Sequence, residues 1–189
     1  MYNSPYLFNM SEKTLTEFNK AFAACENIFD KKLNDYGASW RVMRASSITD
    51  QLLIKARRIR TLETGEAAMV DEGILPEFMA MVNYGIIGII QLKYGYSDIK
   101  DMSPADAMAK YTVERDAARN LMIAKNHDYG EAWREMRVSS FTDIIITKLL
   151  RIKEIEDNDG KTSISEGIDS NYLDIINYSI FAIIRITEE

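Results

Sequence analysis

The stretch DYGASWRVMRASSITDQLLIKARRIRTLE, residues 35–63, recurs as DYGEAWREMRVSSFTDIIITKLLRIKEIE at residues 128–156, and this repetition decides the fold. The two segments are identical at 15 of 29 positions without a gap, and most of the identical residues are polar or charged. The period of 93 residues is far longer than the roughly 20 to 50 residues of a solenoid repeat. The pattern therefore indicates a duplicated domain.

The similarity continues beyond this stretch after a shift of one residue. The continuation pairs Glu72, Gly73, Ile74, Asn83 and Tyr84 with Glu166, Gly167, Ile168, Asn177 and Tyr178. Units of this size can associate as a homodimer, and fusing them makes the partner covalent. We therefore expect a first repeat at residues 1–98 and a second at 99–189, related by a pseudo-two-fold axis and packed as one globular body.

Composition narrows the choice of partners. The net charge is −6 and the pI is near 5, so the chain lacks the basic excess of a general nucleic-acid surface, although free nucleotides remain compatible. A single cysteine, Cys25, excludes an intrachain disulfide and suits a reducing compartment. The first ten residues lack the order of a signal peptide. We expect a cytoplasmic protein, and the sequence leaves open whether it is a monomer or a homodimer.

Each repeat is predicted to contain three helices, which makes the chain an all-α bundle of six main helices. The first helices are expected at 12–33 and from Ser103 to about residue 125, each ended by the glycine of a DYG turn. The second helices are expected to start at hydroxyl residues that act as caps, at 46–49 and 139–142, and to end near Glu63 and Glu156.

The third helices are the most apolar segments. They correspond to FMAMVNYGIIGIIQL, residues 78–92, and YLDIINYSIFAIIRI, residues 172–186. Polar residues interrupt both segments, and both are shorter than the roughly 20 apolar residues that a membrane span needs. We therefore expect them to form the buried centre of the bundle, with no membrane partner.

The lysines of the two repeated segments are predicted to face the core. On a helical wheel of about 100° per residue, Lys148 lies within an apolar arc, and Lys55 holds the same position in the first repeat. Burying an ammonium group costs several kcal/mol unless the charge is paired. Each lysine therefore needs a carboxylate, a phosphate or a route to water.

Polar residues also interrupt the last apolar segment. Asp174, Asn177 and Arg185 share one face with a tyrosine, and Asp174 is the natural partner for Lys148. Because Ala80 replaces Asp174 in the first repeat, we expect one complete site, in the second repeat. If Asp174 coordinates a metal ion, the second repeat is catalytic and the first is a structural copy. The alternative is that Lys148 and Asp174 form only a buried salt bridge.

The repeated polar residues have the chemistry of a nucleotide site. Arginines suit bidentate phosphate recognition, aromatic rings offer stacking faces for a base, and aspartates can hold Mg²⁺. Core anchoring by the tryptophans and ion pairing by the arginines are the alternatives. The predicted ligand-binding residues are Asp35, Tyr36, Trp40, Arg41, Arg44, Lys55 and Arg58 in the first repeat and Asp128, Tyr129, Trp133, Arg134, Arg137, Asp143, Arg151 and Asn177 in the second.

Several other chemistries lack the residues that they need. The only histidine, His127, corresponds to Asn34 in the other repeat, which excludes a histidine mechanism shared by both. The sequence offers no Ser-His-Asp or Cys-His arrangement that would activate a nucleophile. It also lacks a glycine-rich phosphate loop.

The string DYGxxWRxMRxSSxTDxxxxKxxRI, followed by an apolar helix with an Asn-Tyr pair, resembles a bacterial and phage family called nucleotide modification associated domain type one. Both repeats carry the string, so the resemblance covers nearly the whole chain. It implies a link to the modification of nucleotides or DNA bases.

The chain is more distantly similar to the MazG and dimeric dUTPase group of all-α nucleoside triphosphate pyrophosphohydrolases. Their ExxE and ExxD motifs are not reproduced, and Glu166 with Asp169 is an approximate ExxD. This similarity implies that Glu166, Asp169 and Asp174 would bind Mg²⁺ while Lys148 and Arg151 bind phosphates. Asp174, Lys148 and Glu166 would then be the catalytic residues, and a metal-activated water would attack the α-phosphorus.

Two hypotheses follow from the sequence. The first is a nucleotide-binding protein, with Mg²⁺-dependent pyrophosphohydrolase activity or an accessory role in nucleotide modification; a Lys148→Met variant should then lose its ligand. The second is a non-catalytic helical module that binds a protein partner. In that case the buried ion pairs only fix the register of the two repeats, and Lys148→Met alters stability alone.

Overall fold

The computed structural model describes residues 12–65, 73–161 and 167–188, and within these ranges all regular structure is helical. This confirms the predicted all-α class. The elements of the first repeat are α1 (Glu12–Tyr36), the 3-10 helix η1 (Ser39–Val42), α2 (Ala45–Glu63) and α3 (Ile74–Tyr94). Those of the second are α4 (Pro104–Tyr129), the 3-10 helix η2 (Ala132–Glu135), α5 (Val138–Asp157) and α6 (Ile168–Glu188).

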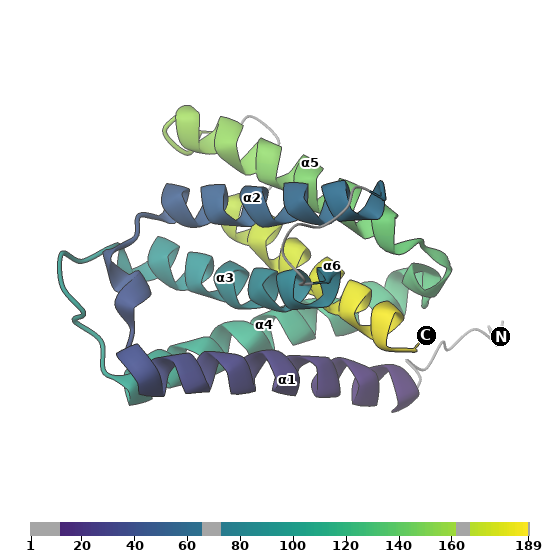
Figure 1. Ribbon diagram of the computed structural model, residues 1–189, viewed down its shortest axis with the longest axis horizontal. Coiled ribbons are helices and arrows are strands. Elements are labelled where there is room, and N and C mark those ends of the chain that lie inside the picture. The colour runs from purple at the N-terminus through teal and green to yellow at the C-terminus, as the bar shows by residue number, and fades with distance from the viewer. Residues whose placement is uncertain (1–11, 66–72, 162–166, 189) are drawn as a thin grey trace, which may run out of the picture.

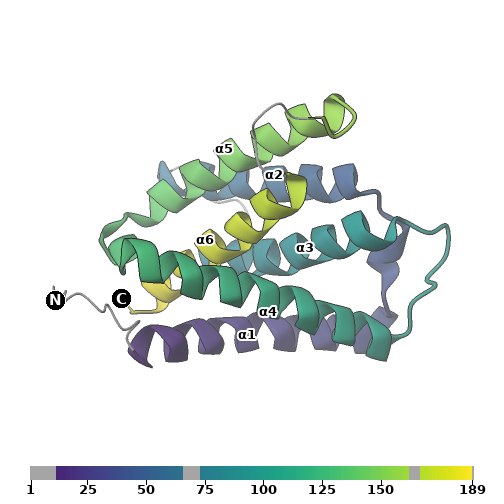
Figure 2. The same ribbon diagram turned by 180° about the vertical axis from the view of Figure 1, so that it is seen from behind.

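The six helices form three layers, and each layer contains one helix from each repeat. Figure 1 shows α2 and α5 on one side, α3 and α6 in the middle, and α1 and α4 on the other side, and the reverse view agrees (Figure 2). The central α3 and α6 pack most extensively against each other. The repeats therefore share one core and do not form two separate bundles.

Two glycines let the central helices approach closely. A β-carbon placed on Gly85 would lie 2.7 Å from a side-chain carbon of Ile176, and one on Gly88 would lie 2.8 Å from the ring of Tyr172. Tyr172 is completely buried, and its hydroxyl lies 2.7 Å from the hydroxyl of Thr49 on α2. The space beside Gly88 is therefore already filled by a ring that cannot move aside cheaply.

The predicted cap and terminating glycines of the first helices are confirmed, although α1 and α4 continue beyond the expected residues 33 and 125 to Tyr36 and Tyr129. The side chain of Ser103 caps α4 by accepting a hydrogen bond of 3.1 Å from the backbone N–H of Asp106. Gly37 and Gly130 follow α1 and α4 with φ of 69° and 64°, a conformation that residues with a β-carbon rarely adopt. The WRxMR segments then form η1 and η2.

The predicted caps of the second helices are wrong. Helix α2 begins at Ala45 and α5 at Val138, so the N-cap positions belong to Arg44 and Arg137, without a side-chain cap. The hydroxyl residues lie inside the helices. Thr49 illustrates their actual role, because its hydroxyl donates to Glu156 on a different helix and does not cap the N-terminus of its own.

The prediction that the third helices are too short for a membrane is wrong for α3. This helix begins at Ile74 and has 21 residues, so it is long and apolar enough by that test. Two thirds of its apolar window, 67%, is nevertheless buried against the rest of the protein. Packing in the centre of the bundle therefore accounts for its composition.

Helices α2 and α5 exchange equivalent contacts across the pseudo-two-fold axis. Thr49 donates a hydrogen bond of 2.8 Å to Glu156, and its counterpart Thr142 donates one of 2.9 Å to Glu63. The outer face repeats the pattern with the ion pairs Lys153–Asp50 and Arg60–Asp143. This reciprocity is the geometry of a homodimer interface, and it explains several polar identities of the repeated string.

Candidate functional site

The second-repeat lysine has the partner that the sequence predicted. Lys148 on α5 lies 2.6 Å from Asp174 on α6, and only 14% of its side chain is exposed. The other oxygen of Asp174 accepts a hydrogen bond from Lys125 on α4, which the sequence did not single out. Two lysines therefore compensate the charge of this buried carboxylate.

In the first repeat, the equivalent lysine pairs with a different acid. Lys55 lies 3.1 Å from Glu77, and Arg58 binds the second oxygen of that carboxylate. Glu77 is buried on α3, three residues before Ala80, so the carboxylate comes from one turn earlier than in the second repeat. The sequence comparison overlooked Glu77 because its counterpart is Asn171, although a helical wheel of α3 would have revealed it.

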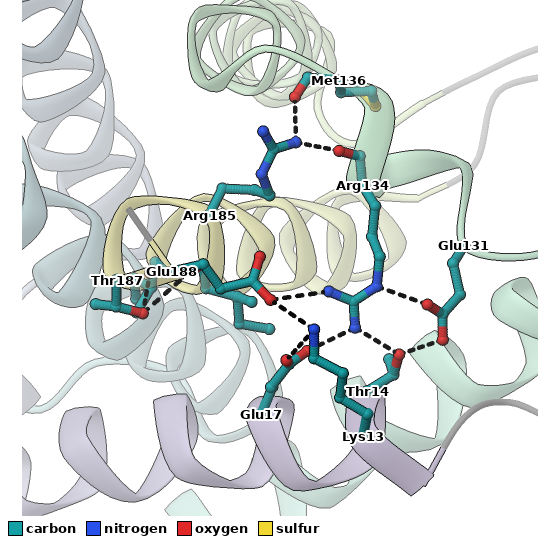
Figure 3. Close-up of polar contacts among 11 residues, drawn as sticks. Lys13, Thr14, Glu17, Glu131, Arg134, Met136, Arg185, Thr187 and Glu188 are labelled. Atoms are coloured by element: carbon teal, nitrogen blue, oxygen red, sulfur yellow. Dashed lines mark hydrogen bonds and ion pairs between the residues drawn. The ribbon is translucent and has the colours of Figure 1, made fainter.

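The first arginine of each WRxMR segment is enclosed by protein acceptors. Figure 3 shows the guanidinium group of Arg134 among Glu17, Glu131 and Glu188, with N–O distances of 2.5, 2.6 and 3.2 Å. Arg41 is 3% exposed and pairs with a different acid, Asp101, at 2.8 Å. These contacts fix η2 against α1 and α6 and η1 against the connection between α3 and α4, which is the ion-pairing alternative for these residues.

Polar side chains from the central helices hold the same two turns. Arg185 on α6 donates to the carbonyl oxygens of Arg134 and Met136, at 2.9 Å for Met136 (Figure 3). Gln91 occupies the equivalent place on α3 and donates to three carbonyl oxygens of the first turn, at residues 40, 41 and 43. Arg185 therefore positions η2, which accounts for its place on the polar face of α6.

Most of the other predicted ligand residues are spread over the surface. Arg44 lies over the ring of Tyr96, and Asp143 pairs with Arg60. Asn177 instead is buried and donates 3.0 Å to the carbonyl of Ala118. The exposed members of the predicted set are Asp35, Tyr36, Arg44, Asp128, Tyr129, Arg137, Asp143 and Arg151. The structure thus does not bring the predicted set together at one place.

The described residues do not fit the predicted magnesium site. Both oxygens of Asp174 accept hydrogen bonds from lysines, Asp169 is exposed, and Glu166 lies outside the described residues. Over 12–65, 73–161 and 167–188, no three carboxylate, histidine or cysteine side chains form a group that could hold a metal ion.

A pocket lies instead in the first repeat, between α1, η1 and α3. It has a volume of about 560 Å³, which is within the range of small-molecule sites. Part of its lining comes from the repeated string and from the Asn-Tyr pair of α3. The residues that matter most for its chemistry are Lys32, Tyr36, Trp40, Ala80, Asn83, Tyr84 and Ile87.

The walls of this pocket are mainly apolar, with four aromatic rings among them, and Lys32 is the basic residue of the lining. Burial raises the pKa of the Tyr36 hydroxyl, and the neighbouring Tyr84 and Asp35 raise it further, so Tyr36 is neutral at physiological pH. Lys55 lies 5.8 Å from the ring centroid of Tyr84. Lys32 lines the pocket on α1 and makes no ion pair within the described part of the chain.

The polar groups inside the pocket differ in whether they are free to hydrogen-bond a ligand. Asn83 donates 3.0 Å to the carbonyl of Cys25 and accepts 2.8 Å from the hydroxyl of Tyr111, so it fixes the wall and has little capacity left for a ligand. The buried indole N–H of Trp40 has no acceptor among the described residues, and the same holds for Trp133 in the other repeat.

The fold is that of an all-α tandem-repeat protein, with a cavity in the first repeat that is lined mainly by apolar side chains. Two segments, residues 32–92 and 125–186, match the family model described as Nucleotide modification associated domain 1 and make up about two thirds of the chain. The chain belongs to this family. Its description gives a coarse link to nucleotide metabolism. No curated protein and no solved structure is detectably similar, and the MazG similarity is not confirmed.

Proposed function

We propose that this protein binds a nucleotide in the pocket of the first repeat. The observation that carries the proposal is the lining of the pocket by the repeated string, through Tyr36 and Trp40, and by the Asn-Tyr pair of α3. The aromatic rings within this mainly apolar lining suit a base. Lys32 at the pocket edge supplies a positive charge for a phosphate.

This proposal differs from the expectation that the second repeat holds the complete site. Asp174 and its two lysines already pair with one another, whereas the small side chain of Ala80 at the equivalent position lines the pocket. Magnesium-dependent hydrolysis remains a finer proposal, for which the described residues offer no metal ligands. The non-catalytic interaction module is the competing function, and the reciprocal contacts of α2 and α5 favour it as the explanation of the Thr, Asp and Glu identities.

The test is a thermal-shift panel of ribo- and deoxynucleoside mono-, di- and triphosphates, each with and without Mg²⁺. A ligand at about 100 times its dissociation constant adds roughly 2.7 kcal/mol to stability. An Ala80→Phe variant, which fills the pocket, should lose the shift, whereas Lys148→Met in the second repeat should keep it.

Other results of the thermal-shift panel would indicate a different site or a different function. Loss of the shift in Lys148→Met alone would move the site to the second repeat. A shift that requires Mg²⁺ would justify an assay for pyrophosphate release. No shift of the wild-type protein with any nucleotide would contradict the proposal and favour the interaction module.

A further inference from the structure

The two tryptophans of the repeated string occupy equivalent positions but have different neighbours. The ring of Trp133 is stacked on Phe181 of α6, with centroids 4.4 Å apart and planes 7° from parallel. Offset parallel rings at this distance are a favourable aromatic arrangement. The second repeat therefore carries its own ring against the face of its tryptophan.

The first repeat lacks this internal ring. Ile87 takes the position of Phe181, and it lines the pocket together with Trp40. The nearest aromatic neighbour of Trp40 in the described part of the chain is Phe29, with centroids 6.5 Å apart and planes tilted by 37°. A ring that would complete the stack is thus missing where the pocket lies.

A charged group differs between the repeats in the same way. In the second repeat Asp174 accepts hydrogen bonds from Lys125 and Lys148. In the first repeat Ala80 replaces the acid, and Lys32, the counterpart of Lys125, lines the pocket. Two substitutions on the same face of one helix therefore remove a planar ring and the acid nearest to Lys32, because the first-repeat acid, Glu77, lies one turn earlier and pairs with Lys55 and Arg58. In the second repeat, a ring on the tryptophan and an acid on the α4 lysine complete the same set of contacts.

We infer that the ligand of the first repeat is a nucleoside 5′-monophosphate or a larger nucleotide whose base stacks on Trp40 as Phe181 stacks on Trp133, and whose phosphate binds Lys32 as Asp174 binds Lys125. The inference rests on the proposed nucleotide-binding function and adds the orientation of the ligand. It also assigns Ile87 and Ala80 as the residues that keep the first site open. In the second repeat Phe181 and Asp174 occupy the two equivalent positions.

Equilibrium titration of AMP, GMP, CMP and UMP and of their nucleosides tests this orientation. Ile87→Phe places the second-repeat ring in the first repeat and should weaken monophosphate binding at least tenfold. The matched variant Phe181→Ile changes the same position of the second repeat and should leave the dissociation constant within twofold.

A second variant tests the charged end and remains informative if Ile87→Phe does not fold. Ala80→Asp supplies Lys32 with an internal acid, which the second repeat accommodates at the same position. It should weaken monophosphate binding at least tenfold and nucleoside binding less than threefold.

The results distinguish a wrong ligand orientation from a wrong function. Unchanged monophosphate binding by Ile87→Phe, or by Ala80→Asp, would overturn the orientation while the nucleotide-binding function stands. No binding of any monophosphate or nucleoside to the wild-type protein would overturn both.

Discussion

Thr49 on α2 donates a hydrogen bond of 2.8 Å to Glu156 on α5, and the same bond recurs in reverse between Thr142 and Glu63. All four residues belong to the repeated string, so the string is in part an interface between the repeats. The polar identities therefore have two explanations that can be separated by experiment. Threonine, aspartate and glutamate join α2 to α5, whereas tyrosine and tryptophan line the pocket.

Removing either hydroxyl at this interface should destabilise the fold. Thr49→Val or Thr142→Val leaves a half-buried carboxylate without its donor, which costs about 1–3 kcal/mol. Urea unfolding measures the loss. Thr147→Val is the matched control, because that exposed hydroxyl bonds only to the carbonyl of Asp143 in its own helix. Equal stability of all three variants would show that the reciprocal bonds contribute nothing.

The two interface glutamates should make stability depend on pH. Burial raises the pKa of Glu63 and of Glu156 above the ordinary value of 4.5, against a smaller lowering by the threonine donors. The folded protein therefore holds these protons more tightly, and the resulting stability is present below about pH 4.5 and lost as the pH rises through the raised pKa. Replacing Glu156 by Gln should thus raise the melting temperature, relative to wild type, more at pH 7.5 than at pH 4.

Glu17 provides the control with the opposite sign. Burial raises its pKa, but hydrogen bonds from Arg134 and Lys13 outweigh this and lower it overall. Its contribution is present above the ordinary pKa and lost as the pH falls. Glu17→Gln should therefore lower the melting temperature more at pH 7.5 than at pH 4. The same sign for Glu17→Gln and Glu156→Gln would contradict this account.

The buried acid of the second repeat should matter more than either of its lysines. Asp174→Asn leaves Lys148 and Lys125 without a counter-charge and should cost on the order of 3 kcal/mol. Lys148→Met should cost less, because Lys125 still compensates Asp174. Denaturant midpoints of the two variants decide the order, and the reverse order would show that Lys125 does not compensate the acid.

The contact between the central helices should not tolerate a methyl group. Gly88→Ala places a β-carbon 2.8 Å from the ring of Tyr172, which overpacks the core and should cost roughly 1–3 kcal/mol. Combining it with Tyr172→Leu makes room, so the double variant should be more stable than the sum of the two single changes predicts. If the stability losses of the two single variants simply add in thermal unfolding, the clash with Tyr172 is not the cause of the Gly88→Ala loss.

The fold was predictable because the signals for it are local and repeated. Apolar spacing indicated six helices, and Gly37 and Gly130 marked the ends of α1 and α4. The charge of Lys148 on an apolar face was enough to predict its pairing with Asp174. These inferences need only helical geometry and the cost of burying a charge.

The site was harder to predict because pairing by sequence position does not show which residues meet in space. The repeated arginines suggested phosphate contacts, but Arg41 and Arg134 bind acids contributed by other segments. The pocket is instead lined by two apolar residues, Ala80 and Ile87. Their role becomes visible only by comparison with Asp174 and Phe181, which hold the equivalent positions in the second repeat. Differences between the repeats proved as informative as identities.

The most direct test of the central claim uses the two tryptophans of the chain, one in each repeat. Trp133→Phe leaves Trp40 as the only indole fluorophore, and Trp40→Phe leaves only Trp133. Titration with the nucleotide that gives the largest thermal shift should quench the emission of the Trp40-only protein and leave that of the Trp133-only protein unchanged. Quenching of Trp133 instead, or of neither residue while the nucleotide still binds, would contradict a base stacked on Trp40 in the first repeat.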